Sequence, residues 1–124
     1  MKKVLLVDDN EKNRYLIHFI LEKGGYKVIE AVDGESAVEL ALKVAPDLII
    51  MDVKMPGIDG LEATRRIRES KAGNKMPILA LTSYAMTGDE AKALNAGCTG
   101  YLTKPIDPKT FVSQIEKFLK RGSG

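Results

Sequence analysis

The chain has 124 residues, a length typical of one domain, and its 44% hydrophobic and 29% charged residues indicate a folded rather than a disordered protein. Nineteen basic and seventeen acidic residues give a net charge of +2, too little to indicate nucleic-acid binding from bulk charge. Its apolar runs fall far short of the roughly 20 residues that span a bilayer, and its start lacks the apolar run of about 7 that a signal peptide needs. The single cysteine, Cys98, excludes an internal disulfide. We therefore expect one cytoplasmic domain with no membrane partner and no direct nucleic-acid partner.

Apolar runs of four residues predict strands that are buried on both faces. They cover residues 4–7, 48–51 and 78–81. Two more polar runs, over residues 26–31 and 98–102, are also typical of strands, and their polarity favours the edges of a sheet.

Helical patterns lie between these runs, and each starts after a residue type that caps helix N-termini. These caps are Asn10, Asp33, Asp59 with Glu62 at capping-box spacing, Thr87 with Glu90 at the same spacing, and Asp107 before Pro108. The first helix is expected over residues 11–23, and its core face over Asn13, Leu16, Ile17, Ile20 and Leu21.

Five strand–helix units in alternation predict a parallel sheet, because each helix carries the chain back so that the next strand starts at the same end as the one before it. Right-handed crossovers place helices on both faces. With the apolar strands at the centre, we expect a flavodoxin-like, doubly wound α/β fold of the (βα)5 type, with strand order 2-1-3-4-5. The domain is expected to cover residues 1–121, and residues 122–124 are typical of a linker or an added tail.

Ligands of such sheets bind beyond the carboxyl ends of the strands, where the strand order reverses. Asp8 and Asp9 follow the first strand, and Asp52 ends the third. A single aspartate at such a place is usually a helix cap, but Asn10 already caps the first helix. Three converging carboxylates repel one another unless a cation binds, and an all-oxygen set suits Mg²⁺.

Two further polar groups follow the remaining central and edge strands. Thr82 follows the fourth strand and Lys104 follows the fifth. Each alone is more typical of a loop hydroxyl or a surface lysine. Together with the three carboxylates they indicate a site for a divalent cation and a phosphate or other anion, with no specific reaction implied.

Four motifs in order resemble those of one known family. VDDN at 7–10, LIIMDVKMPGIDG at 48–60, LTS at 81–83 and GYLTKP at 100–105 resemble the receiver domain of two-component response regulators, of the single-domain kind found in chemotaxis. The resemblance covers about residues 2–120. Ser83 departs from the small residue common in the family after the threonine, and Lys54 and Tyr84 occupy positions that vary in the family.

The resemblance implies a phosphoacceptor at Asp52, which would take a phosphoryl group from phosphohistidine. Asp9, Asp52 and the backbone carbonyl of Lys54 would bind Mg²⁺ directly, and Asp8 would act through metal-bound water. Lys104 and the Thr82 hydroxyl would each contact a phosphoryl oxygen. A cis peptide before Pro105 would direct Lys104 towards the cleft.

The resemblance also implies a switch and an output face. Thr82 would move towards the phosphoryl group, and Tyr101 would turn from an outward to a buried position. The face formed by the fourth helix, fifth strand and fifth helix would then recognise a downstream protein. On this reading the chain is a signalling domain and no enzyme beyond catalysing its own phosphorylation and dephosphorylation.

The first helix carries a second stripe that could dock a partner. Family members receive their kinase or phosphotransfer protein near this helix, so the candidates are Asn13, Tyr15, Leu16, His18, Phe19 and Pro105. Packing of Phe19 on the last helix is the plainer alternative. His18, the only histidine, is expected away from the cleft and so not as a phosphohistidine donor, and Cys98 is expected in the core.

Other functions remain open at this point. The chain could be a receiver domain from a hybrid kinase, or a receiver used as a scaffold without phosphorylation. A flavodoxin-like FMN module would need a loop after the first strand that is not acidic. A phosphohydrolase with an aspartyl nucleophile would use an Asp-x-Asp pair there, whereas Asp8 and Asp9 are adjacent.

Overall fold

The computed structural model describes residues 2–55, 57–71, 73–82, 89–104 and 106–123, with only the helical placement given for 89–90 and 120–123. Five strands form one parallel sheet in the order β2-β1-β3-β4-β5. Their bounds are β1 (Lys3–Val7), β2 (Lys27–Ala31), β3 (Leu48–Asp52), β4 (Ile78–Thr82) and β5 (Gly100–Thr103). The predicted fold class and strand order are therefore confirmed.

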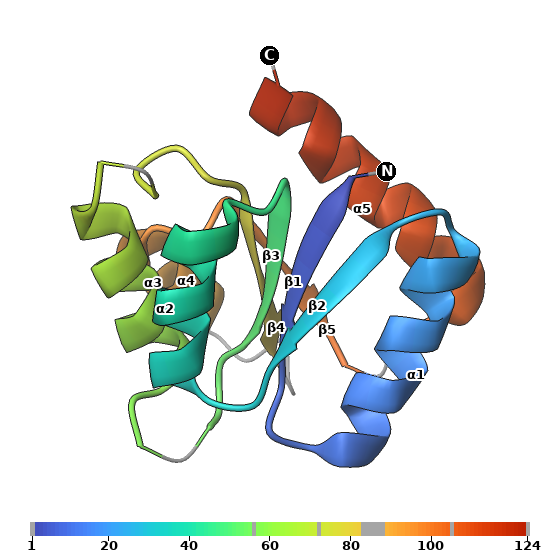
Figure 1. Ribbon diagram of the computed structural model, residues 1–124, viewed down its shortest axis with the longest axis horizontal. Coiled ribbons are helices and arrows are strands. Elements are labelled where there is room, and N and C mark those ends of the chain that lie inside the picture. The colour runs from blue at the N-terminus through green and yellow to red at the C-terminus, as the bar shows by residue number, and fades with distance from the viewer. Residues whose placement is uncertain (1, 56, 72, 83–88, 105, 124) are drawn as a thin grey trace.

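Five helices alternate with the strands and cover both faces of the sheet (Figure 1). Their bounds are α1 (Glu11–Lys23), α2 (Gly34–Val44), α3 (Gly60–Glu69), α4 (Asp89–Ala96) and α5 (Pro108–Ser123). Helices α1 and α5 lie on one face, and α2, α3 and α4 lie on the other. None of the helices in the described ranges is long and apolar enough to cross a membrane.

Both faces of the sheet are covered at its centre, because every residue of β3 and β4 is buried. Successive side chains alternate between two core clusters, as the two-residue period of a strand requires. One cluster, under α2 and α3, includes Ile49 and Met51; the other, under α1 and α5, includes Ile50 and Leu81. Strand β2, at one edge, has only Ala31 buried, in agreement with its polar sequence.

The expected capping residues account for the starts of the first three helices. The side chains of Asn10, Asp33 and Asp59 each accept a hydrogen bond from the backbone N–H three residues later. Asp107 accepts from the N–H of Lys109 at the start of α5. The predicted pair of Thr87 and Glu90 falls outside the residues whose side chains are described.

Two expectations about the core face of α1 need correction. The core face of α1 consists of Ile17, Ile20 and Leu21, whereas Leu16 is 44% exposed. Asn13 is only half-buried. The Asn13 N–H donates to the Asn10 side chain, so Asn13 belongs to the capped first turn of α1 rather than to the core face.

The last strand also differs from the prediction. It begins at Gly100, two residues later than expected, and Cys98 and Thr99 precede it. Thr99 receives the N–H of Ile78 on its hydroxyl and donates its own N–H to the Ile78 carbonyl, so a side chain takes part in the first link to β4. Cys98 is 7% exposed and packs in the core, as expected.

Candidate functional site

The parallel strands bring three sequence-predicted residues together at the carboxyl-terminal ends of the strands. Asp52 is the last residue of β3 and Thr82 the last of β4, while Asp8 comes directly after β1. Helix α3 packs closely behind Asp52, since a Cβ atom on Gly60 would lie 2.2 Å from the Asp52 carbonyl oxygen. The glycine therefore lets α3 begin against the end of β3.

Three carboxylates form an acidic cluster at these strand ends. Asp8, Asp9 and Asp52 each offer an oxygen atom, and these atoms lie within 4.8 Å of one another. Asp8 is 0% and Asp52 4% exposed, whereas Asp9 is open to solvent. Such spacing is close enough for a single cation to contact all three.

Lys104 reaches this cluster from the end of β5. Its Nζ lies 3.2 Å from Asp52 Oδ2 and 3.9 Å from Asp8 Oδ2. Its backbone N–H donates to the Thr82 carbonyl at 2.7 Å, so β4 positions the residue that carries the ammonium group. The structure thus places Asp8, Asp9, Asp52, Thr82 and Lys104 at one site.

The electrostatics of the cluster show in Asp8. Burial raises the pKa of Asp8 to about 6 from the ordinary 3.8, and the charge of Asp52 adds to the rise. The Asn10 N–H, which donates to Asp8 Oδ1 at 2.8 Å, and the Lys104 ammonium act in the opposite direction. Negative charge is therefore only partly compensated by the protein itself.

Two buried oxygen atoms at the site have no hydrogen-bond partner among the described residues. They are Asp8 Oδ2 and Thr82 Oγ1. Buried polar atoms normally have a partner, and those that lack one often face a ligand, ion or water. With the carboxylates of Asp9 and Asp52, the donor set consists of oxygen atoms alone, which fits Mg²⁺.

Lys54 and Tyr101, which the sequence also suggested, lie near the site in different ways. The Lys54 N–H donates to Asp52 Oδ1 at 3.2 Å, which fixes the start of the loop after β3. Tyr101 of β5 is half-buried and packs against the core cluster under α2 and α3. Pro105, with its expected cis peptide, falls outside the described residues.

The remaining docking candidates lie on α1. Tyr15 is 74% and Phe19 49% exposed, and with His18, Glu22 and Glu30 they line a hollow of about 290 Å³. The Lys23 ammonium lies over the Phe19 ring, 4.9 Å from the ring centre, in a cation–π contact. His18 lies in this hollow rather than at the acidic cluster, as expected.

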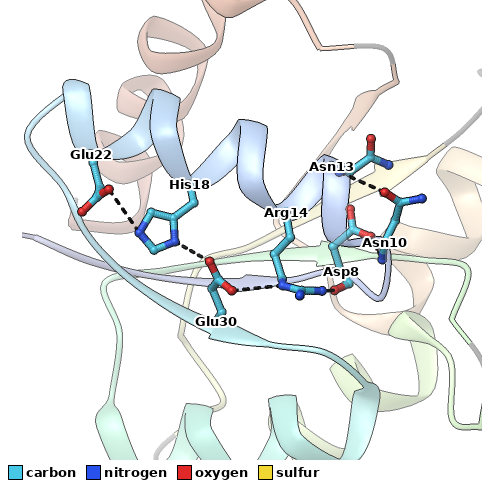
Figure 2. Close-up of polar contacts among 7 residues, drawn as sticks. All are labelled: Asp8, Asn10, Asn13, Arg14, His18, Glu22 and Glu30. Carbon is cyan, nitrogen blue, oxygen red and sulfur yellow. Dashed lines mark hydrogen bonds and ion pairs between the residues drawn. The ribbon is translucent and has the colours of Figure 1, made fainter.

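Sequence reasoning missed a polar network that leads from the acidic cluster to this hollow (Figure 2). Arg14 donates from Nη1 to the Asp8 carbonyl at 2.9 Å and from Nε to Glu30 Oε1 at 3.0 Å. His18 contacts the other Glu30 oxygen, and its Nε2 lies 3.3 Å from Glu22 Oε1. The one available signal was a basic residue one helical turn after Asn10; its partner on β2 could not be read from the sequence.

Known proteins are similar to this chain in sequence and fold. The polar-differentiation response regulator DivK of Brucella ovis is 37% identical over 118 residues, which cover 95% of this chain and 96% of that protein. The chemotaxis protein CheY4 of Vibrio cholerae superposes with a TM-score of 0.90 at 35% identity, over 95% of this chain and 98% of that one.

A second similar structure contains a metal. The receiver domain of the sensor histidine kinase PA1611 from Pseudomonas aeruginosa PAO1 has a TM-score of 0.85 and 38% identity, over 97% of this chain and 95% of that one. It is described with a magnesium ion coordinated in its active-site cleft. The sequence model described as the response regulator receiver domain matches residues 4–116. The chain therefore belongs to the receiver domain family of the response regulators of two-component signalling.

Proposed function

We propose that this chain receives a phosphoryl group on Asp52 from the phosphohistidine of a sensor histidine kinase or a histidine phosphotransfer protein. The observation that carries the proposal is the approach of Lys104 Nζ to 3.2 Å from Asp52 Oδ2, beside the oxygens of Asp8 and Asp9. A nucleophilic carboxylate, a cation and two further carboxylates at one sheet edge are the groups that phosphoryl transfer requires.

The acidic cluster would hold Mg²⁺ through Asp9, Asp52 and the Lys54 carbonyl, with Asp8 acting through bound water. Bound there, Mg²⁺ would supply positive charge opposite the phosphoryl oxygens. Asp8 Oδ2, which has no hydrogen-bond partner among the described residues, and the all-oxygen donor set support this assignment. The magnesium described in the PA1611 receiver domain supports it further.

The chemistry at Asp52 would be an in-line displacement. A carboxylate oxygen of Asp52 forms a bond to phosphorus while the phosphorus–nitrogen bond to the donor histidine breaks, and the imidazole leaves with that electron pair. Lys104 stabilises negative charge on the phosphoryl oxygens. Hydrolysis of the resulting acyl phosphate would return Asp52 to its starting state.

The signal would come from the new charge, about −1.5 to −2, at the end of β3. Thr82 Oγ1, which is buried without a partner in the described structure, would donate its proton to a phosphoryl oxygen. Its movement would bias Tyr101 towards a more buried position and change the face formed by α4, β5 and α5. That face would bind the downstream protein, and the kinase or phosphotransfer protein would dock at α1.

A receiver domain excised from a hybrid kinase remains the second candidate, because the PA1611 receiver is itself part of a sensor histidine kinase. DivK and CheY4, which this chain matches over nearly their whole length, favour a separate response regulator. A scaffold that works without phosphorylation would retain the family fold but would not need Lys104 beside Asp52.

The test is incubation of the chain with acetyl phosphate and Mg²⁺, followed by intact mass measurement. We expect one added phosphoryl group in the wild type, none in Asp52→Asn, and a normal gain in Asp47→Asn. Asp47 is a fair control because it is an exposed aspartate at the opposite end of β3, bonded to the Lys3 N–H. An unchanged wild-type mass, or equal phosphorylation of Asp52→Asn, would reject the proposal.

A further inference from the structure

The loop between β1 and α1 carries two of the three carboxylates of the acidic cluster, so its backbone has to be held in place. The Asp8 N–H donates to the Ala31 carbonyl at 3.2 Å, and the Asp8 carboxylate receives the Asn10 N–H. The Asp8 carbonyl is the remaining backbone group of that residue. It accepts a hydrogen bond from Arg14 Nη1 at 2.9 Å.

We propose that Arg14 is a positioning residue for the acidic cluster, and that Glu30 holds Arg14 in place. We call the two hydrogen bonds from Arg14, to the Asp8 carbonyl and to Glu30, the Arg14–Glu30 bridge. The inference rests on the proposed function, since the cluster it positions is the one assigned to Mg²⁺ and Asp52.

The bridge restricts the backbone of the loop between β1 and α1, because Arg14 bonds the Asp8 carbonyl. The peptide group between Asp8 and Asp9 is planar, so a hydrogen bond to the Asp8 carbonyl also restricts the Asp9 N–H and Cα. Asp9 is exposed and lies outside the strand, two residues after the end of β1. Fixing the Asp8 carbonyl therefore limits the direction in which the Asp9 carboxylate can point.

Charge is not what Arg14 supplies to the site. Within the described residues, Arg14 forms its ion pair with Glu30 and with no carboxylate of the acidic cluster. Glu30 balances the guanidinium charge, and the other Glu30 oxygen contacts His18. Burial acts to raise the pKa of Glu30, but hydrogen bonds from His18 and Arg14 outweigh it and lower the pKa, so Glu30 stays ionised at neutral pH.

The bridge joins α1, which carries Arg14, to β2, which carries Glu30. The Arg14 side chain is 16% exposed and reaches Glu30 on β2 (Figure 2). Glu30 is in register with Leu6 of β1. A guanidinium group donates two hydrogen bonds in a fixed fork, which a lysine ammonium on a flexible chain cannot reproduce. Lysine at position 14 would keep the positive charge and lose the fork.

The experiment compares Arg14→Lys with Arg66→Lys, titrating each with Mg²⁺ alone by isothermal calorimetry. Arg66 is the control on the other face of the sheet: its Nε also bonds a glutamate, Glu62, at 3.2 Å on α3, and its side chain is 48% exposed. We expect Arg14→Lys to weaken Mg²⁺ binding about 10-fold, the lower end of the effect of removing a group that orients a metal ligand. Arg66→Lys should bind as the wild type does. Equal affinity in wild type and Arg14→Lys would overturn the inference.

A second measurement separates positioning from general stability and needs no metal. In the metal-free protein, the carbonyl ¹³C shift of Asp8 and the amide ¹⁵N shift of Asp9 report the hydrogen bond on their shared peptide group. We expect both to change in Arg14→Lys and neither in Arg66→Lys. Unchanged shifts would contradict the positioning role, even if Arg14→Lys lowered the urea midpoint.

The role of Glu30 is tested by the double change. If Glu30 acts through Arg14, Glu30→Gln added to Arg14→Lys should cause no further loss of Mg²⁺ affinity. Additive losses would overturn the role assigned to Glu30. A wild type that binds no Mg²⁺ would instead contradict the proposed function, and the shifts in the metal-free protein would still decide the role of Arg14.

Discussion

Asp52 and Asp8 share one cation of the protein, the ammonium of Lys104, which is closer to Asp52. Lys104 and a bound metal ion would therefore compete for the same carboxylates. In the absence of metal, Lys104 offsets part of the repulsion between the carboxylates, and a bound cation would take over that role. Lys104 would then be available to the phosphoryl oxygens.

Removing Lys104 should therefore separate phosphorylation from metal binding. In Lys104→Ala we expect the rate of Asp52 phosphorylation by acetyl phosphate to fall about 100-fold, as when one group that stabilises transition-state charge is lost. Mg²⁺ affinity should stay equal or rise, because a competing cation is gone. Mass spectrometry and calorimetry measure the two quantities. Lys109→Ala, an exposed lysine of α5, is the control; weaker Mg²⁺ binding in Lys104→Ala would contradict this account.

Asp8 makes a prediction about pH. Its folded-state pKa of about 6 lies above the ordinary 3.8, so ionisation of Asp8 costs the folded state stability. The stabilising contribution of the protonated form is fully present below about pH 4 and is lost as the pH rises through 6. Between pH 5 and pH 7.5 the loss should be about 1 kcal/mol in metal-free protein.

Urea unfolding in the presence of a chelator measures this contribution. Asp8→Asn should lack it, so the stability gap between mutant and wild type should widen in favour of the mutant from pH 5 to pH 7.5. Asp47→Asn, at the opposite end of β3 from the cluster, should show no such widening. A gap that is constant with pH would contradict the raised pKa of Asp8.

At the scale of elements, the ends of β4 and β5 are joined where the proposed switch lies. The Lys104 N–H donates to the Thr82 carbonyl, and Thr82 is in register with Thr103. Tyr101 lies two residues earlier on β5, beside Ala80 of β4. A movement of Thr82 can therefore pass to Tyr101 through two paired strands.

Thr82→Val should disconnect this coupling while leaving the fold intact. Valine has nearly the same shape, and it removes a buried hydroxyl that has no partner in the described structure, so the urea midpoint should not fall. Asp52 should still be phosphorylated. We expect the ring resonances of Tyr101 to shift when the wild type is phosphorylated and to stay in place in the mutant. A full Tyr101 shift in Thr82→Val would contradict the switch.

At the scale of the whole molecule, the site lies where the sheet changes direction. From β1 the chain crosses to β2 on one side, and later to β3 on the other, so α1 and α2 leave on opposite faces. Folds of this kind bind ligands beyond the carboxyl ends of the strands at such a junction. The acidic cluster occupies this place.

Cation binding at the junction of β1 and β3 should stabilise the entire domain. At ten times its dissociation constant, Mg²⁺ should add about 1.4 kcal/mol to the free energy of unfolding. For a domain of this size, that raises the melting temperature by about 5 °C. Circular dichroism with and without a chelator measures the shift. Asp9→Asn should reduce it and Asp59→Asn should not; an equal shift in both would place the ion elsewhere.

The order of elements, the identity of the central strands and most helix starts could be predicted from the sequence. Their causes are local: four-residue apolar runs bury both faces of a strand, and Asn10, Asp33 and Asp59 cap the helix that follows each of them. The set of Asp8, Asp9, Asp52, Thr82 and Lys104 could also be predicted, because parallel strands bring their carboxyl ends to one edge. Leu16 could not, since apolar residues on two overlapping stripes of α1 leave its exposure to the packing of α5 and the sheet.

The sequence by itself determined the fold and the chemical groups of the site, because periodicity, capping and strand ends depend on neighbours along the chain. Only the tertiary structure decided which groups touch: that Lys104 lies nearer to Asp52 than to Asp8, and that Arg14 joins the Asp8 carbonyl to Glu30. These contacts join residues on different elements. They depend on register between strands and on side-chain direction, which no local pattern records.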